Sequence, residues 1–540
     1  MLVMMRPLVS ASVVLNVFAT FGFILVTAVA ATGDVRLVEA AAERDAERVR
    51  ELLSDGVDVD SSRADGTTAL HWAAHLDAIE LVDLLVGAGV DVDASTDNGV
   101  TPLALACENR SVAVVERLLE AGADANVAKT SGETPLMMAA RTGNVGVVEA
   151  LLAHGASVNR ATSKSRQTAL MWATAEGNRD IVGLLIEAGA DVHPSSAKGF
   201  TPLLFAVRNG DMELTQVLLD AGAEVNDPGG DGTHALPLAV VSGRDELAVF
   251  LLEQGADPNG TIFGIPALHA AAAPVGMWLR EWLHLRRAGV TQGLAPFDLA
   301  RRPALVKTLL AHGADPNGRI TASTTTLFFT KVSLGAFDLF SNGTGNLRGA
   351  TPLWVVAYAA QGGQRINVGA DDLKEDAGTP EVAPSYTQIM QILLDAGADP
   401  SLATDDGTTP LMAAAGLGHG GGGPERPRPQ AVAPVKLLLD AGADVNVVNE
   451  AGFTALHGAA FVGINEVVQL LVDQGAKLDA QDFMERTPFR IAEGAKQQFS
   501  FRSSPHTAEL LRDLGADTEL GVPGEVLERQ LQRDADQSQR

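Results

Sequence analysis

Residues 134–155 read TPLMMAARTGNVGVVEALLAHG, and this stretch decides the fold because it holds two short helices and the signals that bound them. Thr134 is a typical N-cap residue, and Pro135 suits the first helical position because it has no N–H to satisfy. The Gly-Asn pair at 143–144 predicts a tight turn, and apolar residues at helical spacing follow it. Gly155 ends the second helix as a glycine just beyond the C-cap. The stretch therefore predicts a helix–turn–helix unit.

The same unit returns at intervals of 33 or 34 residues from Thr68 to His234 and again from Thr454 to Thr487, with wider spacing where insertions intervene. Its starting position is occupied by Thr68, Thr101, Thr134, Thr168, Thr201, His234, Thr351, Thr409, Thr454 and Thr487. The glycine that ends the second helix recurs at Gly155, Gly189 and Gly222. One helix pair cannot bury its own apolar face, so a repeat of this length predicts units that stack on one another.

The segments GTTALHWAA, GVTPLALAC, GETPLMMAA, GFTPLLFAV and GFTALHGAA resemble the G-x-TPLHxAA signature of the ankyrin repeat family. The resemblance implies an all-α fold with β-turn fingers, an α-solenoid of about twelve helix-turn-helix units running from Asp34 to Asp517, with insertions in the C-terminal half. It also implies that His71, His269 and His457 hydrogen-bond the backbone of neighbouring repeats. Cys107 aligns with small core residues and is expected to be a packed thiol.

The repeat pattern divides the chain into segments. They are a signal peptide at 1–30, an N-terminal capping repeat at 31–64, regular repeats at 65–263, interrupted repeats at 264–451, C-terminal repeats at 452–517 and a polar tail at 518–540. The insertions cover 274–299, 318–348, 361–386 and 416–430. The insertion at 318–348 falls in a finger, and the other three fall at the helix-to-helix turn, as do seven extra residues between Thr487 and Gly515.

The N-terminal segment indicates export. No charge occurs between Arg6 and Asp34, and Ala-Val-Ala at 28–30 follows an apolar run, as in a cleavable signal peptide. Uncleaved, the stretch 7–33 is long enough to anchor the protein in the inner membrane. Scarce lysine and abundant Ala, Gly, Val and Asp indicate a GC-rich bacterial genome. We therefore expect a periplasmic or secreted protein, with membrane contact only if cleavage fails.

Composition excludes several kinds of function. With 67 acidic against 40 basic residues the net charge is −27, which disfavours nucleic acid as a partner. The single cysteine excludes an internal disulfide framework and a cysteine-rich zinc site. The glycine-rich stretch at 416–423 has no following Lys-Ser or Lys-Thr, so it indicates a linker rather than a phosphate loop. We expect no catalytic residues, no cofactor and no metal.

Acidic residues recur in the turn after each second helix, where stacking aligns them in a row. They are Asp58, Asp91, Asp124, Asp191, Glu224, Asp257, Asp315, Asp399, Asp444 and Asp517. Two interpretations stay open: a solvated edge that keeps an apolar solenoid soluble, and a site for a basic partner or divalent cations.

The family's variable surface comprises the finger residue before Thr and the residues after the first helix. Here these candidates are His75, Val100, Glu108, Glu133, Arg141, Glu176, Phe200, Arg208, Phe453 and Phe461. The three phenylalanines either protrude as binding residues or lean on adjacent fingers. Trp72 and Trp172 occupy a position that is usually aliphatic in the family and are expected in the core.

Two insertions carry aromatic residues that the repeats lack. The stretch 277–287 predicts an amphipathic helix with Trp278 and Trp282 four residues apart, which either docks a partner or membrane or packs on the neighbouring repeat. Phe328 and Phe329 belong to the finger insertion, which either forms a hairpin or fills the concave groove.

The leading hypothesis is a monomeric, non-enzymatic, exported scaffold that binds a protein partner through its concave face and finger tips, with a basic partner suiting the acidic row. One alternative is a secreted binding protein directed at a host or competitor. Another is an enzyme whose site is built in the insertions around His284, His419 and Asp298. Function resides in sites rather than folds, so the resemblance alone does not name the partner.

Overall fold

A computed structural model describes residues 34–275, 279, 297–321, 347–361, 382–418, 431–497 and 500–523. Trp278, Trp282, Phe328 and Phe329 lie outside the described residues, as does the segment 1–30. The chain divides into two units, which are described separately. The N-terminal unit runs to Lys164 and includes Thr168–Ala190, and the C-terminal unit comprises Ser165–Gln167 and the chain from Asp191 onward.

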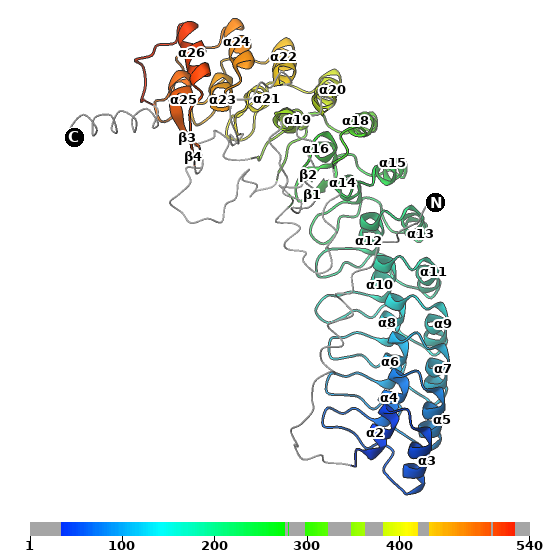
Figure 1. Ribbon diagram of the computed structural model, residues 1–540. Helices are drawn as coiled ribbons and strands as arrows, with labels where there is room; N and C mark the ends of the chain where they lie inside the picture. Colours follow the sequence, from blue (N-terminus) through cyan, green and yellow to red (C-terminus); the bar gives the residue numbers. More distant parts are fainter. Residues whose placement is uncertain are drawn as a thin grey trace, which may run out of the picture. The chain divides into compact units, whose positions relative to one another are not determined.

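The N-terminal unit consists of five helix pairs. Its helices are α2 (Arg36–Ala42), α3 (Ala46–Ser54), α4 (Ala69–His75), α5 (Ile79–Gly87), α6 (Pro102–Glu108), α7 (Val112–Glu120), α8 (Pro135–Thr142), α9 (Val145–Ala153), α10 (Ala169–Glu176) and α11 (Arg179–Glu187). The first helices of the pairs pack on one another as an inner layer, and the second helices form an outer layer. Finger-like connections project on the side of the inner layer (Figure 1).

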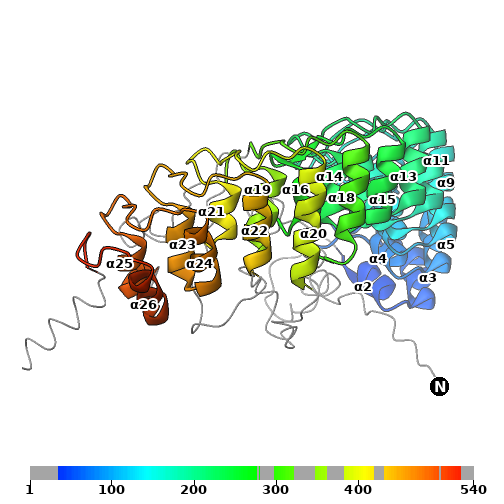
Figure 2. The same ribbon diagram turned by 90° about the horizontal axis from the view of Figure 1, so that it is seen from above.

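The C-terminal unit continues the same arrangement with seven pairs. Its helices are α12 (Pro202–Asn209), α13 (Met212–Asp220), α14 (Ala235–Val241), α15 (Asp245–Glu253), α16 (Ala267–Ala272), α18 (Arg302–Ala311), α19 (Pro352–Ala360), α20 (Val382–Asp395), α21 (Pro410–Ala414), α22 (Val432–Asp440), α23 (Ala455–Val462), α24 (Asn465–Asp473), α25 (Pro488–Gly494) and α26 (Pro505–Asp513). The two layers of this unit are seen from above in Figure 2. The described residues thus contain twelve pairs, which confirms the predicted solenoid.

The described residues contain two short antiparallel hairpins, both in the C-terminal unit. In the first, β1 (Thr261–Ile262) pairs with β2 (Ile265–Pro266) inside a finger. In the second, β3 (Ala495–Gln497) pairs with β4 (Ser500–Arg502) between α25 and α26. The second hairpin is the form taken by the seven extra residues that the sequence places before the last helix.

The predicted helix starts are confirmed at the level of hydrogen bonds. The Thr134 hydroxyl accepts the N–H of Met137 at 3.3 Å. The same bond to the third helical residue is made by Thr68, Thr101, Thr168, Thr201, Thr351, Thr409, Thr454 and Thr487. His234 is the exception, because its side chain makes no cap and its Nδ1 instead lies 3.1 Å from the carbonyl oxygen of Thr261.

The glycine beyond the second helix behaves as predicted. Gly155 has φ +77°, a left-handed conformation that glycine adopts without steric cost. Its N–H donates to Leu152, and the next N–H, of Ala156, donates to the carbonyl of Leu151 at 3.0 Å. These bonds satisfy carbonyls that the helix end would otherwise leave unpaired, and the chain then turns toward the next finger.

In three pairs of the C-terminal unit, a long stretch of chain separates the two helices. Three insertions fall between the two helices of a pair, namely α16 and α18, α19 and α20, and α21 and α22. α20 begins at Val382, before the predicted end of its insertion at 386. Next to the finger insertion, the N–H of Ile320 donates to Ala350, and the N–H of Thr321 donates to Gly264, each at 3.0 Å.

The core lies between the two layers and is built from small and aliphatic side chains. Leu118 and Leu151 of the outer helices are fully buried, as are Ala106 and Ala139 of the inner helices. Small residues let the inner helices approach closely, which accounts for the low aromatic content. Among the residues described, no helix combines the length and apolar character that crossing a bilayer requires.

Candidate protein-binding surface

Two tryptophans lie on the finger side of the inner layer in the N-terminal unit. Trp72 of α4 and Trp172 of α10 are half-buried, so the expectation that they belong to the core is wrong. The Arg63 guanidinium, carried by a finger, lies over the Trp72 ring at 5.3 Å. Arg141 of α8 lies over the Trp172 ring at 4.9 Å. Both indoles are therefore half-buried and covered by an arginine, a cation–π arrangement that holds the ring in one orientation.

His75 joins the first of these clusters. Its ring meets the Trp72 ring edge to face, with centroids 5.9 Å apart, and the side chain is exposed at the end of α4. His75, a predicted binding residue, therefore lies next to Trp72, which the sequence analysis expected in the core.

Three more predicted residues meet in a network of charges between the two tryptophans. The Lys129 ammonium lies 2.7 Å from the Glu108 carboxylate and 3.8 Å from that of Glu133. Arg141 lies 3.9 Å from Glu108, which links the network to Trp172. Only 17% of the Lys129 side chain and 30% of the Glu108 side chain is exposed, so this pair is less screened than an ordinary surface ion pair.

Val100 and Glu176 are not part of this network. The Val100 carbonyl accepts a hydrogen bond from Nε2 of His71 at 2.9 Å, so this finger residue helps to hold the repeats together. Glu176 is exposed at the end of α10. Arg63, Lys129 and the two tryptophans were missed as binding residues. The available signal was the large aromatic residue four positions after the capping threonine, in repeats that otherwise place smaller side chains there.

The signature histidines are structural. His71 Nδ1 accepts the N–H of Thr68 at 3.2 Å while Nε2 donates to the next finger, which fixes the neutral ring. Burial lowers the pKa of His71, and it lowers the pKa values of His269 and His457 to about 4. Burial also raises the pKa of the Cys107 thiol, so the packed thiol that we predicted has no thiolate character at neutral pH.

The finger phenylalanines pack inward instead of protruding. Phe200 is 4% exposed, and its ring lies 5.2 Å from that of Phe205. Arg208 covers this pair, with its guanidinium 5.1 Å from the Phe205 ring. The expectation of a protruding aromatic residue is therefore wrong for Phe200, which packs on side chains of α12 in its own repeat.

The same correction applies to Phe453 and Phe461 in the C-terminal unit. Phe453 is fully buried and Phe461 is 4% exposed, with ring centroids 5.7 Å apart. The aromatic residue that does protrude is Phe483, on the next finger, which packs edge-on against Phe453 at 6.2 Å. Sequence reasoning missed Phe483 because it lies in the finger three positions before Arg486, the finger residue that directly precedes Thr487.

The aligned acids have a structural use. The Asp124 carboxylate accepts the N–H of Asn126 at 2.9 Å, closing a turn within its own repeat. Asn126 then donates from its amide to the carbonyl of Gly155 in the next repeat at 3.0 Å. The turn within the repeat recurs at Asp58, Asp91, Asp191, Asp257, Asp315, Asp399, Asp444 and Asp517. The row is thus a hydrogen-bonded ladder that joins repeats, which neither earlier interpretation anticipated.

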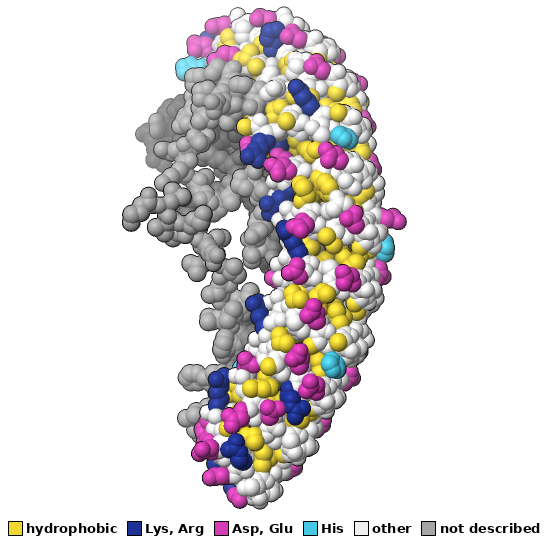
Figure 3. All heavy atoms as spheres, turned by 90° about the vertical axis from the view of Figure 1, so that its right-hand side faces the viewer, with side chains coloured by type: hydrophobic (Ala, Val, Ile, Leu, Met, Phe, Trp, Pro, Cys, Tyr) yellow, Lys and Arg dark blue, Asp and Glu magenta, His cyan; other side chains and the backbone are white. Residues whose placement is uncertain are grey.

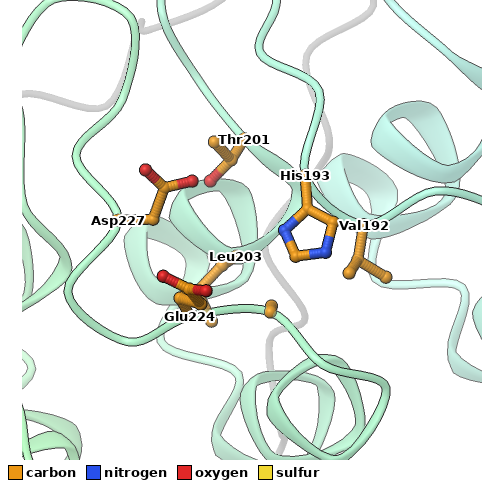
Figure 4. A pocket seen from close by; sticks show the side chains of 7 residues that line it. Val192, His193, Thr201, Leu203, Glu224 and Asp227 are labelled. Atoms are coloured by element: carbon orange, nitrogen blue, oxygen red, sulfur yellow. The ribbon is translucent and has the colours of Figure 1, made fainter.

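Other parts of the described surface show no comparable grouping of aromatic and charged side chains. Acidic, basic and apolar side chains are interspersed over the face made by the outer helices (Figure 3). A shallow hollow in the C-terminal unit is lined by His193, Glu224 and Asp227, but the Asp227 carboxylate points toward Thr201 rather than toward the imidazole (Figure 4). Across the described ranges, no three His, Cys, Asp or Glu residues are grouped so that they could hold a metal ion.

Fold and surface together define a class: an α-solenoid of stacked helix pairs that presents inner helices and fingers as an extended recognition surface. Comparison with protein families supports this assignment. The family described as ankyrin repeats (3 copies) matches residues 37–129, 121–196, 189–262, 382–482 and 428–497, more than half of the chain. The protein therefore belongs to the ankyrin repeat family, whose repeats are protein-interaction scaffolds. A search of curated proteins found no matching relative.

Proposed function

We propose that this protein is an exported, non-enzymatic scaffold that binds a protein partner across the inner helices and fingers of its N-terminal unit. The observation that carries the proposal is the pair of half-buried tryptophans of the inner helices, Trp72 and Trp172, each held beneath an arginine. Tryptophan and arginine are enriched among the residues that carry most of the binding energy at protein interfaces, and an indole offers a large contact area with little conformational freedom to lose.

The spacing of the two anchors favours a protein over a small molecule. Trp72 and Trp172 lie on α4 and α10, with α6 and α8 stacked between them. Packed helices are about 8–10 Å apart, so three intervals place the indoles about 24–30 Å from each other. A surface of that length matches one side of a protein interface rather than a ligand pocket.

The charges between the anchors favour a polar but nearly neutral contact. Lys129 and Arg141 balance Glu108 and Glu133, and the ion pairs are already formed in the free protein. A partner therefore meets a preorganised network and loses little side-chain entropy in binding to it. This region does not by itself select a basic partner.

The non-enzymatic part of the proposal rests on where the reactive side chains lie. His71 and His457 have both ring nitrogens engaged by the backbone of their own and the following repeat. Cys107 is buried in the inner layer. His71, His457 and Cys107 are thus committed to packing between repeats.

The proposal that the protein is exported rests on residues 1–30, which resemble a signal peptide. In the alternative, residues 7–33 stay uncleaved and anchor the protein in the membrane. The uncharged apolar run and the Ala-Val-Ala sequence support cleavage and release into the periplasm or beyond. Sequencing of the amino terminus of protein recovered from the cell envelope tests this directly. A mature chain that begins near residue 31 is expected, whereas retention of Met1 would show that the segment is an anchor.

The binding proposal is tested by affinity capture from the protein's own cell envelope, with cross-linking and quantitative mass spectrometry. Bait carrying Trp72→Ala and Trp172→Ala is compared with wild type. Ile79→Ala is the matched control, because Ile79 is a large exposed side chain of the same unit on an outer helix. We expect a partner that is enriched by wild type and by the control and is depleted at least about tenfold by the double variant.

A further inference from the structure

Large apolar side chains protrude unevenly from the described surface. They are Ile79, Met212, Val448, Phe483, Met484, Leu520 and Val522. Five of these seven belong to the last two fingers and to the segment that follows α26. Single exposed apolar residues need no explanation, but a gathering of them at one end of a soluble protein indicates a contact surface.

Backbone hydrogen bonds hold this gathering together. The N–H of Val522 donates to the carbonyl of Glu485 at 3.1 Å, which places the segment after α26 against the last finger. The N–H of Phe483 donates to the carbonyl of Ala451 at 2.9 Å, which joins the last finger to the one before it. We call Phe483, Met484 and Val522 the terminal finger patch. Phe483 is 47% exposed, Met484 39% and Val522 48%.

Glu485 stands at the edge of this patch in a left-handed conformation with φ +60°. The corresponding residue of the preceding finger is Gly452, with φ +79°, which adopts this conformation without strain. Two other fingers also carry a non-glycine residue with positive φ. One is Arg166, whose guanidinium donates to the carbonyl of Ser196, and the other is Phe263, in the turn between β1 and β2. The Glu485 carboxylate makes no such internal bond among the described residues.

Among the described residues, the exposed charged side chains at the patch are acidic. Glu485 and Glu450, on the neighbouring finger, are exposed. The nearest arginines are buried and already paired. Arg486 lies 2.7 Å from Asp482, and Arg490 lies 2.8 Å from Glu493. The field at the patch is therefore negative, and it is not balanced as the network beside Trp172 is.

We propose that the terminal finger patch binds a segment of a partner protein in which an apolar side chain is flanked by lysine or arginine. Phe483, Met484 and Val522 offer apolar contact area, and Glu450 and Glu485 supply charges complementary to the flanking cations. An anionic membrane surface is disfavoured, because the same carboxylates would repel it. The patch lies in the C-terminal unit and does not depend on the surface around Trp72 and Trp172.

The chain allows a selective test, because Cys107 is its only cysteine and is buried. The variant Met484→Cys carries one reactive thiol at the patch and can be labelled with an environment-sensitive fluorophore. The matched control is Met212→Cys. Met212 is 40% exposed and is followed by a glutamate, as Met484 is, but it lies on α13. Each labelled protein is titrated with the peptides Ac-KKLFKK-NH2, Ac-EELFEE-NH2 and Ac-KKSSKK-NH2, and separately with vesicles containing phosphatidylserine.

We expect a saturable change at position 484 with Ac-KKLFKK-NH2 alone, none at position 212, and weaker binding at high salt. Adding Glu485→Gln weakens binding about two- to fivefold, whereas Glu213→Gln leaves it unchanged. Phe483→Ser weakens it at least about tenfold. Equal responses at the two positions, equal binding of the glutamate peptide, or a response to vesicles alone would overturn the proposal. None of these results depends on Trp72 or Trp172, so this proposal and the proposed function fail independently.

Discussion

The backbone N–H of Asp124 donates a hydrogen bond to the carboxylate of Asp93, 3.0 Å away, so two acidic residues of successive repeats face each other. Asp60 and Asp479 occupy the same position in their repeats, whereas several other repeats place asparagine there, as at Asn126, whose amide also donates to the next repeat. A carboxylate cannot make that second bond. Burial, and then the charges of Asp124 and Asp91, raise the pKa of Asp93, although its hydrogen bond acts in the opposite direction.

Asp93→Asn is therefore expected to stabilise the N-terminal unit. The new amide can donate to Gly122 as Asn126 does to Gly155, and one charge repulsion is removed. A net hydrogen bond contributes about 0.5–1.5 kcal/mol, so the urea midpoint should rise accordingly. Asn126→Asp is the matched reverse change and should lower the midpoint. A lower midpoint for Asp93→Asn would contradict the ladder as described.

The benefit of Asp93→Asn should also depend on pH. The pKa of Asp93 is raised in the folded state. The contribution of Asp93 to the free energy of unfolding is therefore fully present below the pKa of the unfolded state and is lost as pH rises through the pKa of the folded state. The stability difference between variant and wild type should therefore be largest at neutral pH and shrink in acid. Urea midpoints at a series of pH values measure this, and a difference that grows in acid would contradict the assignment.

In the C-terminal unit, the contribution of His457 to stability is lost as pH falls, opposite to that of Asp93. Burial lowers its pKa to about 4, and the neutral ring accepts the N–H of Thr454 and donates to the carbonyl of Arg486. Its contribution is present above the unfolded pKa near 6.5 and is lost as pH falls toward 4. The protection of amides in α23–α26, meaning the slowing of their exchange relative to the intrinsic rate at each pH, should decrease over that interval. In His457→Gln, this protection should be lower at neutral pH and should depend less on pH.

Phe453 and Phe483 should respond very differently to truncation although their rings are in contact. Phe453 is fully buried, so Phe453→Ala is expected to cost about 3–5 kcal/mol. Phe483 is 47% exposed, and Phe483→Ala should cost less than about 1 kcal/mol. Chemical unfolding of the two variants measures both values. Similar losses would show that the finger aromatics are not divided between core and surface in this way.

Glu485→Gly should stabilise the last finger, because glycine adopts the left-handed conformation freely whereas other residues lose about 1–2 kcal/mol. The same change removes a carboxylate from the terminal finger patch. We therefore expect a higher unfolding midpoint together with weaker binding of Ac-KKLFKK-NH2. Gly452→Glu, at the corresponding position of the preceding finger, is the reciprocal control and should destabilise.

The parts of the fold that were predictable are those in which local chemistry repeats. Thr134 caps its helix and Gly155 ends the next through backbone requirements that depend only on nearby residues, so position in the sequence sufficed. The direction of a single side chain on a finger or inner helix depends on neighbouring repeats. Phe200 is buried under Arg208, whereas Trp172 stays half-buried under Arg141. Residue type and spacing alone did not distinguish these two outcomes.

The acidic row shows the same limit of prediction from residue type and spacing. Its alignment follows from the repeat period, but the bond from Asn126 to Gly155 connects residues of different repeats through their conformation. The sequence therefore predicted where the acids lie and missed that they join the stack. Likewise, Phe483 stands out only once its exposure and its contact with Phe453 are known.

The central claim, that the N-terminal unit binds a protein through Trp72 and Trp172, is tested most directly by measuring partner affinity. The partner captured from the cell envelope is titrated by isothermal calorimetry against wild type, the variant carrying Trp72→Ala and Trp172→Ala, and Ile79→Ala. We expect at least about tenfold weaker binding for the double variant and wild-type affinity for Ile79→Ala. The unfolding midpoints of both variants should be unchanged. Equal affinity of all three proteins would contradict it.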